Sequence, residues 1–311
     1  MCEENKTKVT EFHLSGFHNL YNYRTLFFIV LLVIYMVIVV GNLLIILLVS
    51  FTDRLQIPMF FFLKHLAVAD VLLTTSVVPV MLDMILNHGR VISLVECLIQ
   101  MSLYGIFVSV QCFLLAVMSY DRYLAICSPL HYAFLITPNR CLLLISGSWS
   151  LVSALVLSEI GLISQFEFCG PNIIDHFLCD FHPLLELSSS NTSTLIIEDF
   201  VFSIFMVICP FTFIIITYIC ILITIMKITS TSGRKKAFST CSSHLTTVCT
   251  YYGTLIIIYM SPSDKTPSDV NMFLSLLYIL LTPLINPFIY SLRNHEFEKA
   301  IKKILKRIQV E

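Results

Sequence analysis

The feature that most constrains this chain is a series of long apolar stretches without charged side chains. Five of them contain no Asp, Glu, Lys or Arg: Leu26–Ser50, Leu98–Tyr120, Phe200–Met226, Ala237–Met260 and Val270–Leu292. Two more are interrupted, Phe60–Leu82 by Lys64 and Asp70, and Cys141–Ile163 by Glu159. A membrane-crossing helix needs about 20 mainly apolar residues. Because backbone polar groups in lipid must be satisfied internally, we predict an all-α fold with seven membrane-spanning helices.

The composition agrees with a membrane protein. Apolar residues make up 57% of the chain and charged residues 13%, with a net charge of −1. Soluble domains have about 45–50% apolar and about 25% charged residues. These values exclude a disordered chain, most soluble enzymes and a nucleic-acid binder that depends on basic charge. We therefore expect no nucleic-acid partner.

The distribution of Lys and Arg predicts the orientation. With seven spans, 14 of the 19 basic residues lie on the side that holds the first, third and fifth connections and the C-terminal segment. Basic residues favour the cytoplasmic side. We therefore expect an extracellular N-terminal segment at 1–24, a transmembrane domain at 25–292 and a cytoplasmic tail at 293–311.

Two glycosylation sequons and an amphipathic tail fit this orientation. Asn5 heads a sequon on the expected outer side, and Asn191 heads a second one in the long connection between the fourth and fifth spans. We predict glycosylation at Asn5. The tail Asn294–Arg307 alternates apolar and basic residues, which favours a short helix on the anionic membrane surface. A disordered basic tail is the alternative.

Several polar residues fall inside the spans, where ionisable groups are costly and usually functional. Asp70 in the second span, Asn42 in the first and Asn286 in the seventh could share a network, or each could bond only to local backbone. Pro287 follows Asn286 and predicts a local break in the seventh helix, and Pro210 predicts one in the fifth. Asp121, Arg122 and Tyr123 end the third span, where the carboxylate and the guanidinium can pair or separate. An ordinary solvated helix end, which often carries such a pair, is the alternative.

Several ordered segments resemble those of olfactory receptors, which belong to the rhodopsin-like G-protein-coupled receptors. The similar segments are Val9–Phe12, Gly41-Asn42, Pro58–Leu63, Met118–Tyr132, Trp149, His176–Asp180, Lys236–Leu245 and Pro283–Asn294. They cover essentially the whole chain, and their combination in this order is specific. The seventh-helix segment is most similar to the tetrapod-type class. The resemblance implies a receptor in the plasma membrane, not an enzyme.

In this family a small volatile odorant binds between the third, fifth, sixth and seventh helices. The resemblance places ten residues of this chain at that depth: Tyr104, Val108, Ser109, Cys112, Phe202, Ser203, Met206, Tyr252, Leu255 and Tyr259. The four on the third helix share one face by their spacing. Such apolar positions with a few hydroxyls suit a volatile ligand, although ordinary helix packing would use the same residue types.

The resemblance also implies coupling to a stimulatory heterotrimeric G protein on the cytoplasmic face. Arg122 would be the switch, paired with Asp121 at rest and released on activation. The other positions that match the family's activation residues are Tyr123, Tyr218, Lys236, His244, Asn286, Pro287 and Tyr290. The expected partners are therefore an odorant, this G protein and membrane lipid.

The resemblance pairs Cys97 with Cys179 in a disulfide. The family often pairs the position of Cys169 with a third loop cysteine, but that position here is Ser189. We therefore expect Cys169 to be unpaired. Gln111 stands where many relatives have a carboxylate that helps Asp70 bind sodium, so we predict no metal and no cofactor.

Other membrane protein classes fit the sequence less well. A retinal protein would need a lysine in the seventh span, and Val270–Leu292 has none. A transporter would show paired broken helices and repeat symmetry, which are not evident. An intramembrane hydrolase or metal site would have to use His176, Cys179, Asp180 and His182 of the outer loop. The main alternative is a non-olfactory small-molecule receptor of the same superfamily.

Overall fold

The computed structural model describes residues 9–16, 23–169, 172–188, 192–260, 268–293 and 297. Its long helices are α1 (Arg24–Phe51), α2 (Pro58–Asn87), α3 (Leu94–Cys127), α5 (Pro138–Ile163), α8 (Cys209–Lys227), α9 (Thr231–Met260) and α10 (Ser268–Arg293). The short helical segments are η2 (Asp53–Leu55), α4 (Pro129–Leu135), α6 (Phe181–Glu186), α7 (Ser193–Ser203) and η3 (Ile204–Ile208). The strands are β1 (Glu11–Leu14), β2 (Arg90–Ser93) and β3 (Ile173–Ile174). The predicted sequons at Asn5 and Asn191 lie outside the described residues, as does the predicted tail helix apart from Phe297.

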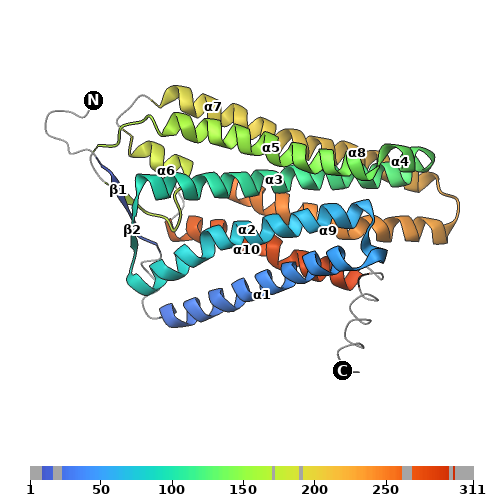
Figure 1. The fold of residues 1–311 in the computed structure, drawn as a ribbon, viewed down its shortest axis with the longest axis horizontal. Helices are drawn as coiled ribbons and strands as arrows, with labels where there is room; N and C mark the ends of the chain where they lie inside the picture. Colours follow the sequence, from blue (N-terminus) through green and yellow to red (C-terminus); the bar gives the residue numbers. More distant parts are fainter. Residues whose placement is uncertain are drawn as a thin grey trace.

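The long helices run side by side as one bundle, with the strands at one end and α4 at the other (Figure 1). We call these the sheet end and the α4 end. The predicted helical membrane bundle is confirmed, and each predicted span lies inside one helix or one continuous helical stretch. Six stretches of the described chain are long and apolar enough to cross a membrane, while α9 is equally long but more polar. α9 contacts α3, α8 and α10, and its polar residues Ser243, His244, Thr247 and Thr254 are buried within the bundle.

The outer faces of the helices are apolar. Val40 is 60% exposed, Leu143 is 69% exposed and Phe205 is 61% exposed. A soluble protein rarely leaves such broad apolar surface open to water. The buried faces are also mainly apolar, but they carry the polar groups of the spans, among them Asn42, Asp70 and Asn286. An apolar outer face with the polar groups turned inward is the distribution that a lipid environment requires.

A small sheet closes the sheet end, which the sequence analysis did not foresee. β1 lies between β2, with which it is antiparallel, and β3, with which it is parallel. The strand alternates exposed and buried residues, so Phe12 and Leu14 face the core. The rings of Phe12 and Phe168 pack edge to face, with their centroids 5.5 Å apart. Strand β1, which precedes the first span, therefore connects the segment that follows α2 to the segment that follows α5.

The end of α3 at the sheet end is fixed by a capping box and a disulfide. The Ser93 backbone N–H donates to the Glu96 carboxylate at 2.8 Å, and the Glu96 N–H donates to the Ser93 hydroxyl at 3.2 Å. One turn on, Cys97 is bonded to Cys179 across a sequence separation of 82 residues, which confirms the predicted disulfide. The Cys179 N–H also donates to Gln100 Oε1 at 3.1 Å.

The prediction of an unpaired Cys169 is wrong, because Cys169 is disulfide-bonded. That prediction considered only a partner in the same loop, at the position of Ser189. The backbone beside Cys169 is in fact joined to the segment before α1, since the Val9 N–H donates to the Phe168 carbonyl at 2.8 Å. A loop cysteine in this layer is therefore not limited to partners from its own loop.

The predicted break near Pro210 takes the form of a π-helical turn. α7, η3 and α8 form one continuous helical stretch in which η3 is π-helical, and the Cys209 N–H donates to the Ile204 carbonyl five residues back. Proline has no N–H to donate and its ring clashes with the carbonyl of residue i−4. The wider π turn directly before Pro210 accommodates this residue, and such turns often occur at functional sites.

Candidate functional site

The centre of the bundle holds a fully buried carboxylate with two amide donors. Gln111 Nε2 on α3 donates to Asp70 Oδ1 at 2.9 Å, and Asn286 Nδ2 on α10 donates to Asp70 Oδ2 at 2.8 Å. The sequence suggested that Asp70, Asn286 and Asn42 share a network or bond separately to local backbone, and the Asp70–Asn286 bond is the part of that network that is present. Gln111, which the sequence singled out only as a variant position, is the second direct partner. The three side chains link α2, α3 and α10 through charge-assisted hydrogen bonds.

Asn42 contacts the same part of α10 by a different route. Its Nδ2 donates to the Ile38 carbonyl at 2.9 Å and to the Pro283 carbonyl at 3.0 Å rather than to Asp70. The Pro283 carbonyl would otherwise accept from the N–H of residue 287, which is proline and has none, so the Asn42 amide supplies the missing donor. The predicted break in the seventh span is not present, because α10 runs as one helix through Pro283 and Pro287. A Cβ built on the adjacent Gly41 would lie 3.0 Å from the Pro287 ring, so α1 approaches this segment closely because residue 41 is glycine.

At the α4 end, Asp121 and Arg122 form an ion pair. Arg122 Nη2 lies 2.9 Å from Asp121 Oδ2, and the Asp121 side chain is fully buried. The Tyr132 hydroxyl on α4 donates to the other carboxylate oxygen, Oδ1, at 2.7 Å. Burial and the neighbouring Asp121 both raise the pKa of Tyr132, so the phenol keeps its proton and remains a donor. Sequence reasoning quoted Tyr132 within a motif but assigned it no role.

The other predicted activation residues gather near this pair. The Tyr218 hydroxyl on α8 and His244 Nδ1 on α9 are hydrogen-bonded at 2.6 Å. Tyr290 on α10 is buried, and Arg122 interacts electrostatically with Tyr218, His244 and Tyr290. Helices α3, α8, α9 and α10 thus place these side chains around one guanidinium.

Two of the predicted activation residues are less informative. Tyr123 is partly buried at the end of α3. Lys236 lies in the first third of α9, but its side chain is outside the described part. Neither one has a described contact that would assign it a role.

The predicted ligand residues occupy facing segments. Tyr104, Val108, Ser109 and Cys112 lie on α3, Phe202 and Ser203 on α7, Met206 on η3, and Tyr252, Leu255 and Tyr259 on α9. Cys112, Met206 and Tyr252 are buried, and Tyr252 stacks on Phe211 of α8 at 4.4 Å. The side chain of Tyr259 is outside the described part. This arrangement brings α3, η3 and α9 together around mainly apolar side chains.

A tyrosine that sequence reasoning missed joins these helices. The Tyr251 hydroxyl donates to the Val108 carbonyl at 2.9 Å and lies 3.1 Å from Cys112 Sγ. It accepts a hydrogen bond from the Tyr278 hydroxyl of α10 at 3.0 Å. A buried tyrosine needs such partners. The signal in the sequence was the Tyr251-Tyr252 pair itself, whose polar atoms have to be satisfied inside an apolar span.

The outer-loop residues considered for metal binding are engaged otherwise. Cys179 is in the disulfide, and Asp180 Oδ1 accepts from the Phe181 N–H at the start of α6. His176 stacks on Phe177 and accepts from the Leu178 N–H, and burial lowers its pKa. Within the described residues, no group of three His, Cys, Asp or Glu side chains could hold a metal ion. The His182 side chain is outside that part.

The fold and these contacts define a class of protein. A bundle of seven long helices in the described chain, with an apolar outer face and buried polar clusters, is a multi-pass helical membrane protein. Its buried networks link the helices through Asp70 at the centre and through Asp121 and Arg122 at the α4 end. Ionisable groups inside a membrane-spanning bundle are rare and mark functional sites.

Comparison with known proteins gives the family. The family model described as olfactory receptor matches residues 31–308. The chain is 43% identical over 308 residues to olfactory receptor 11L1 of Homo sapiens, covering 99% of this chain and 95% of that protein. It is 45% identical over 304 residues to olfactory receptor 5P81 of Mus musculus, covering 97% and 96%. The chain belongs to the olfactory receptor family, a family of G-protein-coupled receptors and not of enzymes.

Proposed function

We propose that this protein is an odorant receptor that binds small volatile molecules within the helix bundle and activates a stimulatory heterotrimeric G protein, raising cyclic AMP. The observation that carries the proposal is the Asp121–Arg122 pair, which sits at the α4 end with Tyr132, next to Tyr218 and His244. Arg122 is the switch, held by Asp121 at rest and released toward the G protein on activation.

The ligand acts through the helices that meet at Tyr251. An odorant shifts a two-state equilibrium only as far as it binds the active state more tightly than the resting state. The hydroxyl of Tyr251 ties α3 to α9 and α10, so a ligand that displaces α3 or α9 at this depth also changes the packing around Asp70. The π turn η3 carries the buried Met206, which forms a third wall of the proposed odorant site beside α3 and α9.

The proposal includes the topology. The α4 end, which carries most basic residues, lies in the cytoplasm, and the sheet end is extracellular. Residues 1–24 form the extracellular segment that is glycosylated at Asn5, 25–292 form the transmembrane domain of a plasma-membrane protein, and 293–311 form the cytoplasmic tail on the lipid surface. The buried Phe297, whose ring lies 5.5 Å from Phe60, supports a tail that returns to the bundle.

The ligand site is tested by a cyclic-AMP screen of cells that express the receptor, an olfactory-type stimulatory G protein and trafficking factors. A panel of volatiles is applied to the wild type and to Cys112→Ala and Leu255→Ala variants. We expect dose-dependent responses whose half-maximal concentrations rise about fivefold or more in the variants, because truncating a side chain that anchors a ligand costs about 1 kcal/mol or more.

The control for this screen is Leu155→Ala, which truncates a leucine of similar size on α5, outside the predicted ligand residues. It should respond as the wild type does. Equal half-maximal concentrations in all variants at equal surface abundance would place the ligand elsewhere. No response to any volatile, despite confirmed surface expression, would contradict the odorant assignment itself.

Tyr132→Phe is expected to raise ligand-independent cyclic AMP several-fold. The substitution removes one of the two groups that hold the buried Asp121 carboxylate, and a hydrogen bond to a charged group contributes about 1.5–3 kcal/mol. The resting pair is then less stable, so Arg122 is released more often. Tyr120→Phe is the control, because Tyr120 packs against Phe213 instead. Unchanged or lower basal signalling at equal surface abundance would refute the role given to Tyr132.

A further inference from the structure

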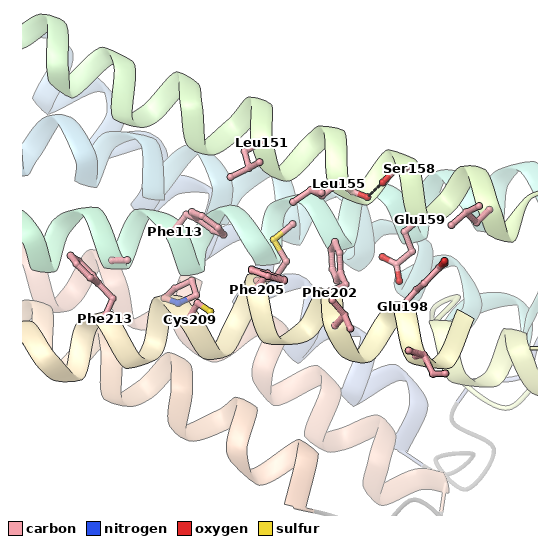
Figure 2. A pocket seen from close by; sticks show the side chains of 16 residues that line it. Phe113, Leu151, Leu155, Ser158, Glu159, Glu198, Phe202, Phe205, Cys209 and Phe213 are labelled. Atoms are coloured by element: carbon pink, nitrogen blue, oxygen red, sulfur yellow. Dashed lines mark hydrogen bonds between the residues drawn. The ribbon is translucent and has the colours of Figure 1, made fainter. Parts of the chain in front are cut away.

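A large groove on the side of the bundle is lined mostly by residues that the proposed function does not use. It has a volume of about 970 Å³ and lies between α3, α5 and the continuous α7–η3–α8 stretch. Figure 2 shows aromatic side chains along its floor and far wall, among them Phe113, Phe202, Phe205 and Phe213. Its volume is within the range of sites that enclose drug-sized ligands.

The groove opens toward the membrane. Leu151 and Leu155 on one wall and Phe205 on the other are exposed on the outside of the bundle. These residues lie in the apolar middle portions of α5 and of the fifth span. A ligand would therefore reach the groove through the lipid, which requires a long apolar body.

One end of the groove is acidic. Glu159 lies four residues before the end of α5, and Glu198 lies in the middle of α7, the first part of the continuous α7–η3–α8 stretch, so both are toward the sheet end. Figure 2 shows both carboxylates in the space between the two helices. Glu198 and the adjacent Asp199 also interact electrostatically with Glu159. These acidic groups repel one another, so a cation placed between them would be favoured.

The groove lining, all of it within the described residues, contains no Lys, Arg or His. The sequence has no Lys or Arg between Arg140 and Lys227, whereas the same stretch contains seven Asp and Glu residues. The charge of this region is therefore complementary to a positively charged partner, and charge complementarity of this kind selects ligands.

We propose that this groove binds a lipophilic amine, with the protonated nitrogen between Glu159 and Glu198 and the hydrocarbon body along Phe202, Phe205 and Phe213. The aromatic faces add attraction for the cation where it passes Phe202. The site is distinct from the proposed odorant site, because the two carboxylates and the α5 wall are not part of it. Phe202 and Met206 line both sites, so the two sites lie on either side of the same helical stretch.

The test is photo-crosslinking on the full-length receptor reconstituted in phosphatidylcholine nanodiscs. The probe is dodecylamine with a diazirine at mid-chain, and the uncharged control probe is the matching dodecanol. We expect amine crosslinks to map to α5 and to the 197–213 stretch, with competition by unlabelled dodecylamine about fivefold or more stronger than by dodecanol, since one ion pair near lipid is worth at least about 1 kcal/mol.

Charge-removing variants test the role of the carboxylates. Two variants are compared with the wild type: Glu198→Gln, and Glu198→Gln combined with Glu159→Gln. Each should lower the apparent affinity for the amine about fivefold or more and leave the affinity for the alcohol unchanged. Glu11→Gln removes an exposed acid at the same end of the bundle and should have no effect. If the double variant fails to fold, the single variant and the comparison of the two probes on the wild type still show whether the groove recognises the charge of the amine.

Two outcomes would overturn the proposal. Equal labelling and competition by the amine and the alcohol would make the groove a site for neutral lipid chains only. Amine crosslinks that map to α9 instead, which does not line the groove, would place the amine in the proposed odorant site. Loss of the response to volatiles in Leu255→Ala or Cys112→Ala does not bear on this test, so the two proposals can fail separately.

Discussion

Arg122→Ala is expected to abolish odorant-evoked cyclic AMP while the receptor still reaches the cell surface. The Arg122 side chain is only 12% exposed and is paired with Asp121 at 2.9 Å. In the proposed mechanism the guanidinium leaves this pair to contact the G protein. Alanine has no guanidinium and cannot make this contact. The response should fall below detection at every odorant concentration, whereas a variant in the ligand site only shifts the half-maximal concentration.

The control for this experiment is Arg122→Lys. Lysine keeps the charge but has no planar fork for bidentate bonding, so we expect a weak residual response. Surface abundance is measured in parallel by an antibody to an N-terminal tag. A full response from Arg122→Ala at normal surface abundance would refute the switch role.

The second large effect is expected from loss of the Cys97–Cys179 disulfide. Replacing either cysteine by serine should reduce surface abundance more than tenfold. Both sulfurs are buried, and the bond closes a long loop with a sequence separation of 82 residues. Opening a loop of this length costs about 4 to 5 kcal/mol in the chain-entropy model, a large part of the stability of a typical domain.

A double-mutant cycle separates the disulfide from other effects of serine. The Cys97→Ser/Cys179→Ser variant should be no worse than either single variant, because all three lose the same bond. Cys209→Ser replaces an exposed free cysteine and should traffic normally. Normal surface delivery of both single variants would contradict the structural importance of this disulfide.

The membrane-spanning helices were predictable because their signal is local. Length and apolarity of a segment such as Leu26–Ser50 suffice to require a helix in lipid, whatever its neighbours are. The irregularity near Pro210 was predictable for the same reason, since proline disturbs its own helix. Even so, only the structure shows that the disturbance is a π turn, Ile204–Ile208.

The sheet was not predictable from the residues of β1 alone. Four residues with alternating burial are too short for a reliable strand signal, and β1 is a strand only because β2 and β3 flank it. The error on Cys169 has the same origin. A disulfide partner depends on which segments meet in space, and the layer that joins Val9 to Phe168 is formed by segments far apart in sequence.

The sequence by itself determined the number and placement of the spans, the family, the Cys97–Cys179 pair and the identity of the charged residues inside the bundle. The tertiary structure decided their partners: Gln111 for Asp70, Tyr132 for Asp121, Tyr251 for Val108 and Cys112, and the acidic groove between α5 and α7. The physical reason is that hydrophobic length acts along one segment, whereas each of these contacts depends on the depth and rotation of separate helices, which the packing of the whole bundle sets.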